Sequence, residues 1–379
     1  MKRIHSIDVL RSITMFLMIF VNDVAGVDRI PEWLKHTAAD LDGMGFSDLI
    51  FPAFLFIVGL SLPSAIQARI KKGKSDLSIV AYILLRALAL IIMGFFQVNF
   101  ENYNHESALI SYPVYKIVVT LGFFLIWLDY PETMATTRKS ACIAMGIVIL
   151  ALMAYFFKGE HGGMQPHWWG ILGIIGWAYL FAALVYLATK GRIKLLIGAF
   201  LIFSIINITT HLNVLHVNLW MIGDASSITL MMAGALIATG YQHLTISKTW
   251  LVLAISGLLA IVFGFIIRPY AGGISKIYAT PAWVFICMGI AILVFEALIY
   301  LVDVSGKKEW FSFIKPAGTS TLTCYLIPYL LYSFLSLINF NYSYSLTYGF
   351  GGILRSFFLA FIVIRIVGLM ERWGLRLRV

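Results

Sequence analysis

The chain has 379 residues, of which 60% are hydrophobic and only 12% are charged, and its mean hydropathy is +0.89. A soluble domain carries roughly twice that charged fraction, and a soluble chain of this length could not bury so much apolar surface. The net charge of +10 comes from basic residues at helix ends, not from one patch or tail, so no nucleic acid is expected as a partner. These numbers exclude a soluble enzyme and predict a protein that lies in membrane lipid.

Apolar runs of roughly 18 to 22 residues follow one another along the chain, the length that crosses a bilayer core of about 30 Å. We expect an all-α polytopic membrane protein whose short connections leave a single transmembrane domain over residues 1–379, with no soluble appendage. The runs predict about twelve transmembrane helices, at residues 7–25, 47–68, 78–98, 113–130, 139–157, 168–189, 193–210, 226–243, 249–267, 281–302, 317–338 and 349–370.

The basic residues of the loops predict the orientation of these helices. Lysine and arginine gather at residues 2–3, 69–74, 138–139, 190–194, 248, 307–315 and 372–378, whereas the opposite loops carry few of them. Positive-inside orientation makes the first set cytoplasmic, and with an even helix count both termini lie there. Six of the eight histidines then fall in outer loops, so chemistry is expected on the outer side.

Neither the cysteines nor the histidines suggest a metal site. All three cysteines lie within apolar runs, which predicts neither a disulfide framework nor a ligand pair. The histidine pairs 161/167 and 211/216 do not have the i, i+4 spacing that places two ligands on one helical face. We therefore expect no metal and no metal-dependent chemistry.

The first predicted helix carries charges that are unusual within a membrane. Asp8 and Arg11 have i, i+3 spacing and can pair on one face. They either orient the helix at the cytoplasmic edge or face a cavity or substrate path, since charges near hydrocarbon are costly.

The outer end of the first predicted hairpin gathers polar residues. Asn22 lies near the end of the first helix, and Asp48 follows Ser47 at the start of the second, where it suits the helix dipole as a cap or serves as a functional partner. His36 lies in the loop between them, which also holds Asp40 and Asp42. A loop histidine is often inert, but an imidazole oriented by a carboxylate or amide is a general base near neutral pH.

The same residues resemble a known family. Ser6-Ile-Asp8-x-x-Arg11, Asn22, His36 and the run from Asp48 to Gly59 are similar to the heparan-α-glucosaminide N-acetyltransferase family of transmembrane acyltransferases, which has bacterial relatives. Residues 274–283 and 302–304 resemble later landmarks of that family.

The resemblance implies a transfer of acetyl from cytoplasmic acetyl-CoA to the amine of an amino sugar or glycan on the far side of a bacterial inner membrane, and it leaves a homodimer open. Catalysis is expected at His36, Asn22 and Asp48, and acceptor binding at Asp40, Asp42 and Lys276. Binding of acetyl-CoA, as cosubstrate, is expected at Arg3, Asp8, Arg11 and Lys315.

Two choices remain open at the level of sequence. His36 acts either as a base for direct transfer or as an acylated relay. A twelve-helix secondary transporter for a small polar or anionic solute has the same layout, although such carriers usually show two similar halves and none is visible here. A structural or lipid-binding membrane protein is the third alternative. Binding of labelled acetyl-CoA separates an enzyme from a carrier.

Overall fold

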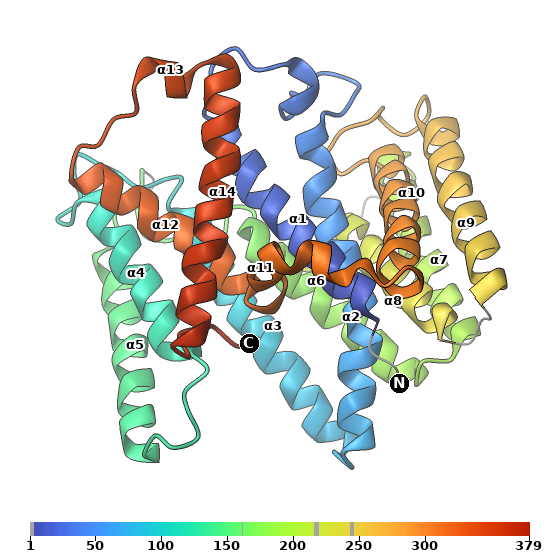
Figure 1. The fold of residues 1–379 in the computed structure, drawn as a ribbon, viewed down its shortest axis with the longest axis horizontal. Helices are drawn as coiled ribbons and strands as arrows, with labels where there is room; N and C mark the ends of the chain where they lie inside the picture. The colour runs from blue at the N-terminus through green and yellow to red at the C-terminus, as the bar shows by residue number, and fades with distance from the viewer. Residues whose placement is uncertain (1–3, 161, 216–219, 243–245) are drawn as a thin grey trace.

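The computed structural model describes residues 4–160, 162–215, 220–242 and 246–379 (Figure 1). Within these ranges the regular elements are all helical. The long helices are α1 (His5–Val24), α2 (Ile50–Lys71), α3 (Asp76–Asn99), α4 (Tyr112–Trp127), α5 (Thr136–Phe156), α6 (Gly170–Thr189), α7 (Ile193–His211), α8 (Ser226–Tyr241), α9 (Ile246–Ile267), α10 (Pro281–Leu298), α12 (Thr321–Leu337) and α14 (Gly349–Arg372). The short helical segments are η1 (Glu32–Leu34), η2 (Phe46–Leu49), η3 (Ile299–Val304), η4 (Lys307–Ile314), α11 (Lys315–Thr319) and α13 (Tyr344–Thr347).

Each predicted apolar run falls on a helix, which confirms an all-helical, multi-pass architecture. Among the described residues, eight helices are long and apolar enough to cross a membrane, and a ninth crossing arises if η4, α11 and α12 are counted as one broken span. Helices α4 and α8 are shorter, with 16 residues each, and α1 carries three charged residues along its length. The number of crossings and the side of each terminus stay predictions.

The run predicted as one helix at 317–338 is not continuous. The helical segments Lys307–Thr319 and Thr321–Leu337 meet within it at an angle of 72°. Ser320, at φ −126° and ψ 45°, leaves the helical region between α11 and α12, and Pro316 and Gly318 precede it. Proline and glycine both weaken a helix interior, and hydropathy alone does not register such a break.

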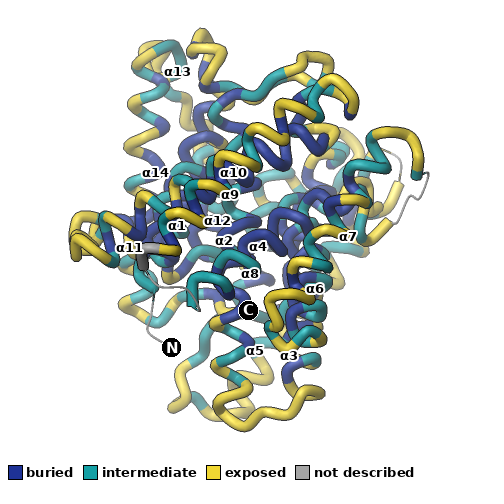
Figure 2. The backbone as a smooth tube through the Cα atoms, turned by 90° about the vertical axis from the view of Figure 1, so that its right-hand side faces the viewer, coloured by how far each residue is buried: buried dark blue, intermediate teal, exposed yellow. Residues whose placement is uncertain are grey.

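Helix α1 lies in the centre of the bundle, and most of its residues are buried (Figures 1 and 2). Beside it, α2 and α8 approach closely at Gly59 and Gly234, where an added Cβ would lie 2.0 Å and 2.1 Å from a carbonyl oxygen of the other helix. Small residues allow this close approach, which gives packing between helices in lipid, where the hydrophobic effect contributes little.

Both ends of α1 are held by carboxylates. At the first turn, the backbone N–H groups of His5 and Ser6 donate to the side chain of Asp303, over 3.0 and 3.3 Å. At the last turn, Asp23 is 5% exposed and accepts hydrogen bonds from Arg355, at 3.0 Å, and from the Tyr332 hydroxyl. These contacts fix α1 against η3 at one end and against α12 and α14 at the other.

Two loops meet at the opposite end of the molecule from the start of α1 (Figure 1). The loop of residues 26–46, which follows α1, contacts the loop of residues 268–280, which precedes α10. The N–H of Gly43 donates to the carbonyl of Ile274 at 3.0 Å, and Asp42 accepts from the N–H of Ile274 at 2.7 Å. This contact brings together the two loops that carry His36 and Lys276.

Candidate active site

His36 and Asp48 form a direct side-chain contact. The Nδ1 atom of His36 lies 2.7 Å from Oδ1 of Asp48. The carboxylate is 1% exposed, whereas the imidazole is 37% exposed and so remains open to a ligand. The arrangement joins a buried orienting group to an accessible histidine.

The contact fixes the tautomer of the neutral imidazole. An ionised carboxylate only accepts hydrogen bonds, so Nδ1 of His36 carries the hydrogen and donates it to Asp48. The other ring nitrogen, Nε2, then holds a free lone pair. A histidine oriented in this way is suited to take a proton from an incoming nucleophile.

The position of Asp48 follows from the turn that precedes α2. Its second oxygen accepts the backbone N–H groups of Thr37 and Gly45, each at 3.0 Å. The carbonyl of Asp48 accepts the indole N–H of Trp283 at 3.2 Å. Asp48 is therefore a cap for η2 and a partner of His36 at the same time, so the two readings of this residue do not exclude one another.

Gly45 lets the loop approach this turn closely. An added Cβ at Gly45 would lie 2.0 Å from the carbonyl oxygen of Lys35, the residue before His36. Nearby, Ser47 donates to the carbonyl of Leu34 at 2.5 Å. The two contacts hold the segment that carries His36 against the start of α2.

Lys276 reaches the same pair from the loop before α10. Its Nζ lies 3.1 Å from Nδ1 of His36 and 3.8 Å from Oδ1 of Asp48. Burial lowers the pKa of Lys276, and the attraction of Asp48 opposes that shift only in part. Because Nδ1 already donates to Asp48, the ammonium of Lys276 acts on His36 chiefly through its charge.

The two loop aspartates differ in their surroundings. Asp42 accepts the Nε–H of Arg268 at 2.9 and 3.1 Å and the N–H of Ile274, and these bonds, that of Ile274 foremost, lower its pKa. It therefore has a structural role that the sequence did not indicate. Asp40 is exposed and forms no hydrogen bond with another residue of the described ranges. Acceptor binding by either residue stays a prediction.

Asn22 is not joined to the His36–Asp48 pair. It is exposed near the C-terminal end of α1, and its side chain forms no hydrogen bond with another residue in the part of the chain that the structure describes. Its neighbour Asp23 makes the buried contacts there, with Arg355. Charged residues inside apolar runs were the signal for this ion pair, but their pairing across 332 positions is invisible in the sequence.

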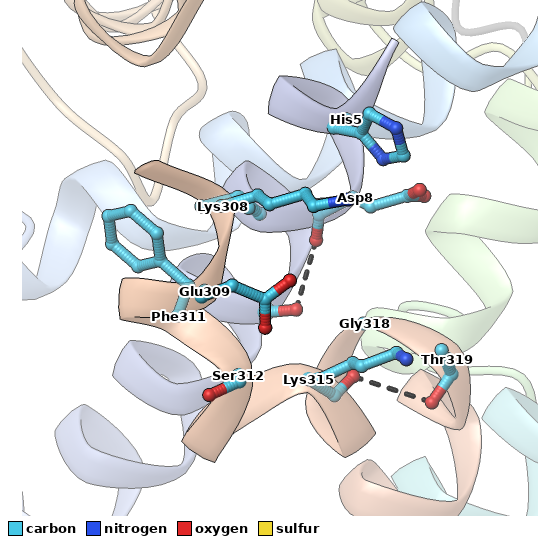
Figure 3. Close-up of a pocket in the computed structure, with 11 residues that line it drawn as sticks. His5, Asp8, Lys308, Glu309, Phe311, Ser312, Lys315, Gly318 and Thr319 are labelled. Atoms are coloured by element: carbon cyan, nitrogen blue, oxygen red, sulfur yellow. Dashed lines mark hydrogen bonds between the residues drawn. The ribbon is translucent and has the colours of Figure 1, made fainter. Parts of the chain in front are cut away.

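The residues predicted to bind acetyl-CoA are divided between two cavities. Asp8 and Lys315 line a cavity of about 190 Å³ beside the start of α1 (Figure 3), together with His5, Lys308 and Glu309. Arg11 lies 3.5 Å from Asp8 and lines a separate, larger cavity. Arg3 falls outside the described residues.

The larger cavities extend along the bundle. The one nearer the predicted cytoplasmic side is called the inner cavity here, and the other the outer cavity. The inner cavity has a volume of about 430 Å³ and is lined by Arg11, Ser61, Arg86 and Tyr179 among many apolar side chains. The outer one, of about 670 Å³, is lined by Lys276 and by five tryptophans, Trp168, Trp169, Trp177, Trp220 and Trp283. Ile171 of α6 contributes to the walls of both. In the described ranges, no three His, Cys, Asp or Glu side chains are placed to hold a metal ion.

Comparison with known proteins identifies the family. Residues 3–221 match the family described as "Domain of unknown function (DUF5009)". The chain belongs to the DUF5009 family. It is also similar to the heparan-alpha-glucosaminide N-acetyltransferase of Mus musculus, with 28% identity over 154 residues, and to that of Homo sapiens, with 35% identity over 102 residues.

These matches cover 38% and 27% of this chain and only 22% and 14% of the two relatives. The chain thus spans a small part of the length of the curated relatives it matches. They confirm the relationship to the N-acetyltransferase family that the first hairpin indicated.

Proposed function

We propose that the protein is a membrane acetyltransferase that moves acetyl from cytoplasmic acetyl-CoA to the amine of an amino sugar or glycan on the outer side of a bacterial inner membrane. The observation that carries the proposal is the contact between His36 and Asp48, an accessible imidazole oriented by a buried carboxylate. The relationship to N-acetyltransferases supports the reaction class. Residues 1–379 would act as one transmembrane domain.

The proposed chemistry uses the free Nε2 of His36. The acceptor nitrogen attacks the thioester carbonyl carbon while Nε2 takes the amine proton, so that a C–N bond forms. The C–S bond then breaks, and the proton passes from the imidazolium to the departing thiolate of CoA. Asp48 keeps the hydrogen on Nδ1 and stabilises the imidazolium between these steps. The side-chain amide of Asn22 is the proposed donor to the developing oxyanion.

An acylated histidine is the alternative course. Nε2 of His36 then attacks the thioester itself, CoA leaves, and the acceptor amine takes the acetyl group from the imidazole. Trapping of an acetyl group on His36 in the absence of acceptor distinguishes this relay from direct transfer.

The two larger cavities support a route from one side to the other. Arg11 in the inner cavity would face the donor, with Asp8 and Lys315 at the smaller cavity near the start of α1. The acceptor would occupy the outer cavity, where Lys276 lies beside His36. Asp42 contacts Ile274 in the loop that carries Lys276, and Asp40 precedes it by two residues, so both are proposed to meet the acceptor from the loop after α1. The tryptophan faces suit the C–H faces of a sugar ring.

The test is acetyl transfer by the purified protein in sealed proteoliposomes. Labelled acetyl-CoA is placed on one side and glucosamine, its oligomers or cell-wall amino sugars on the other. We expect labelled N-acetyl product only on the acceptor side, and none with His36→Ala. Movement of unmodified amino sugar across the membrane, without acetylation, would instead establish the carrier alternative.

A further inference from the structure

Arg86 is a charged residue at mid-membrane depth. It lies ten positions after Asp76, the first residue of α3, which corresponds to about 15 Å along the helix, or half of an apolar core of about 30 Å. A guanidinium at that depth is costly unless it faces a cavity and meets an opposite charge. The side chain of Arg86 does line the inner cavity of about 430 Å³.

No carboxylate pairs with Arg86 in the described ranges. Its Nη1–H donates to the hydroxyl of Tyr82 at 3.0 Å, and its guanidinium carbon lies 4.9 Å from the ring centre of Tyr179. The Nε–H is buried without a hydrogen-bond partner. Tyrosine hydroxyls and rings leave the positive charge of Arg86 uncompensated, and they also hold the guanidinium in place.

A second guanidinium lines the same cavity. Arg11 on α1 is held by hydrogen bonds to Ser61 and to the carbonyl of Gly318, and by its contact with Asp8. Arg378 lines the cavity as well. Arg11 contacts Asp8 and Arg378 contacts Asp129, whereas the contacts of Arg86 in the described ranges are with tyrosines, so Arg86 brings a positive charge to this wall that no carboxylate offsets. The rest of the wall is mostly apolar, with Met15, Phe54 and Leu90 among its residues. Such a cavity suits a ligand with an anionic group and a slim, weakly polar chain.

We propose that Arg86, with Arg11, binds a phosphate group of the acyl-CoA donor inside the membrane. This inference rests on the proposed acetyl transfer, and it adds a binding residue on α3. Arginine is well matched to phosphate because its planar donors bond two oxygens at once. The ligand would supply both the missing negative charge and an acceptor for the buried Nε–H.

The depth of Arg86 in the membrane bears on whether the thioester of a bound acyl-CoA can reach His36. The pantetheine arm of CoA, when extended, is shorter than an apolar core of about 30 Å. With its phosphates held at the cytoplasmic surface, by Lys315 for example, the thioester would stop inside the membrane. A phosphate at Arg86 starts the arm halfway across. Ile171 lines both this cavity and the one that contains Lys276, so the arm would pass Ile171 to reach His36.

The test compares CoA binding by the full chain in lipid nanodiscs. Arg86→Gln should weaken CoA binding roughly 10- to 100-fold, the usual effect of one charge-assisted hydrogen bond. Arg86→Lys keeps the positive charge but loses the planar guanidinium that can bond two phosphate oxygens, so it should weaken CoA binding less than Arg86→Gln. Arg365→Gln, an exposed arginine within α14, is the matched control and should bind CoA as the native protein does.

Pantetheine, which has no phosphate, separates charge from packing. It should bind the native protein and Arg86→Gln equally. Unchanged CoA affinity in Arg86→Gln, or an equal loss for pantetheine and CoA, would overturn the proposal. If Arg86→Gln does not fold, the Arg86→Lys comparison decides with the same two ligands.

Phosphate could also come from an anionic lipid, so the binding is repeated in phosphatidylcholine and in phosphatidylglycerol. A thermal shift produced by phosphatidylglycerol, lost in Arg86→Gln and accompanied by no CoA binding, would assign the site to lipid and overturn the donor assignment. Arg86-dependent CoA binding without acetyl transfer to any acceptor would leave the phosphate site standing and remove the proposed function. The proposed function and the phosphate site together predict that Arg86→Gln raises the KM for acetyl-CoA with little change in kcat.

Discussion

The imidazole of His36 donates its Nδ1 hydrogen to Asp48, a residue twelve positions later that is almost fully buried. The turn at Gly45 and the backbone N–H groups that bind Asp48 set this geometry before any ligand is present. The Nε2 atom of His36 is therefore left with a lone pair that can accept a proton, and this role can be tested directly.

Replacement of His36 by alanine should abolish acetyl transfer. Losing a general base or relay typically costs 10²- to 10⁴-fold in rate. The same change removes a hydrogen-bond partner of the buried Asp48, which typically costs about 1–3 kcal/mol, so thermal unfolding is measured beside the rate. His167→Ala, in another exposed loop, is the control and should leave the rate unchanged. Turnover near the native rate in His36→Ala would show that the active site lies elsewhere. Asn22→Ala should slow turnover to a smaller extent.

Asp48→Asn should keep the fold and lose most activity. The amide oxygen can still accept the N–H groups of Thr37 and Gly45, so the cap survives. The NH₂ group then faces Nδ1 of His36, which must become an acceptor and leave the hydrogen on Nε2. We expect a rate loss of about 10²- to 10⁴-fold at nearly constant Tm. A native rate in this variant would reduce Asp48 to a helix cap.

Gly45→Ala should damage the site and the fold together. The new methyl group would overlap the carbonyl of Lys35, and such overpacking typically costs about 1–3 kcal/mol. Gly43→Ala, two residues away, has nothing within 4 Å of the added Cβ and is the matched control. The Tm and the rate of acetyl transfer should both fall in Gly45→Ala and stay near the native values in Gly43→Ala. Equal behaviour of the two would contradict the close approach at Gly45.

The contact between Asp42 and Arg268 should fail in acid. Hydrogen bonds from Ile274 and Arg268 lower the pKa of Asp42 below its ordinary 3.8. A carboxylate whose pKa is lower in the folded state stabilises the fold at pH values above its unfolded-state pKa. That stabilisation is lost as the pH falls through the folded-state pKa. Thermal scans of the native protein and Asp42→Asn should differ at neutral pH and converge as the pH falls below 3.8. A pH-independent difference would exclude titration of Asp42 as its cause.

The orientation of the first hairpin is tested by labelling. Single cysteines are placed at Thr37 and Ser75 in a chain that lacks Cys142, Cys287 and Cys324. An impermeant thiol reagent should reach the two positions from opposite sides of the membrane, so in intact cells it should label the cysteine at Thr37 and not the one at Ser75. The basic residues at 69–74 predict the cytoplasmic side for Ser75. Reaction of both positions from the same side would overturn the proposed topology and, with it, transfer across the membrane.

Hydropathy was sufficient to predict the helices because lipid demands long apolar segments with satisfied backbone groups. It could not predict the break at Ser320, which depends on local backbone geometry. His36, Asp48 and Lys276 were named from the sequence, and the structure brings the three together. Their roles stay predictions.

Other parts of the site depend on contacts between distant segments. Asp42 and Arg268 are 226 positions apart, and no local pattern pairs them. Arg86 did carry a signal, as an arginine within a predicted apolar span, but only the packed helices reveal that it faces the same cavity as Arg11. Long-range pairing of charges is the information that one sequence does not contain.

The two ion pairs that hold the first hairpin differ in their exposure to solvent and therefore to dissolved ions. Asp23 and Arg355 are 5% and 12% exposed, whereas Asp42 and Arg268 are 50% and 40% exposed. Counterions at 0.1 M screen exposed charges beyond about 10 Å and weaken exposed pairs, but they affect a buried pair much less. Rising ionic strength should therefore weaken the contact between the loops of residues 26–46 and 268–280, while the buried pair keeps α1 anchored to α14.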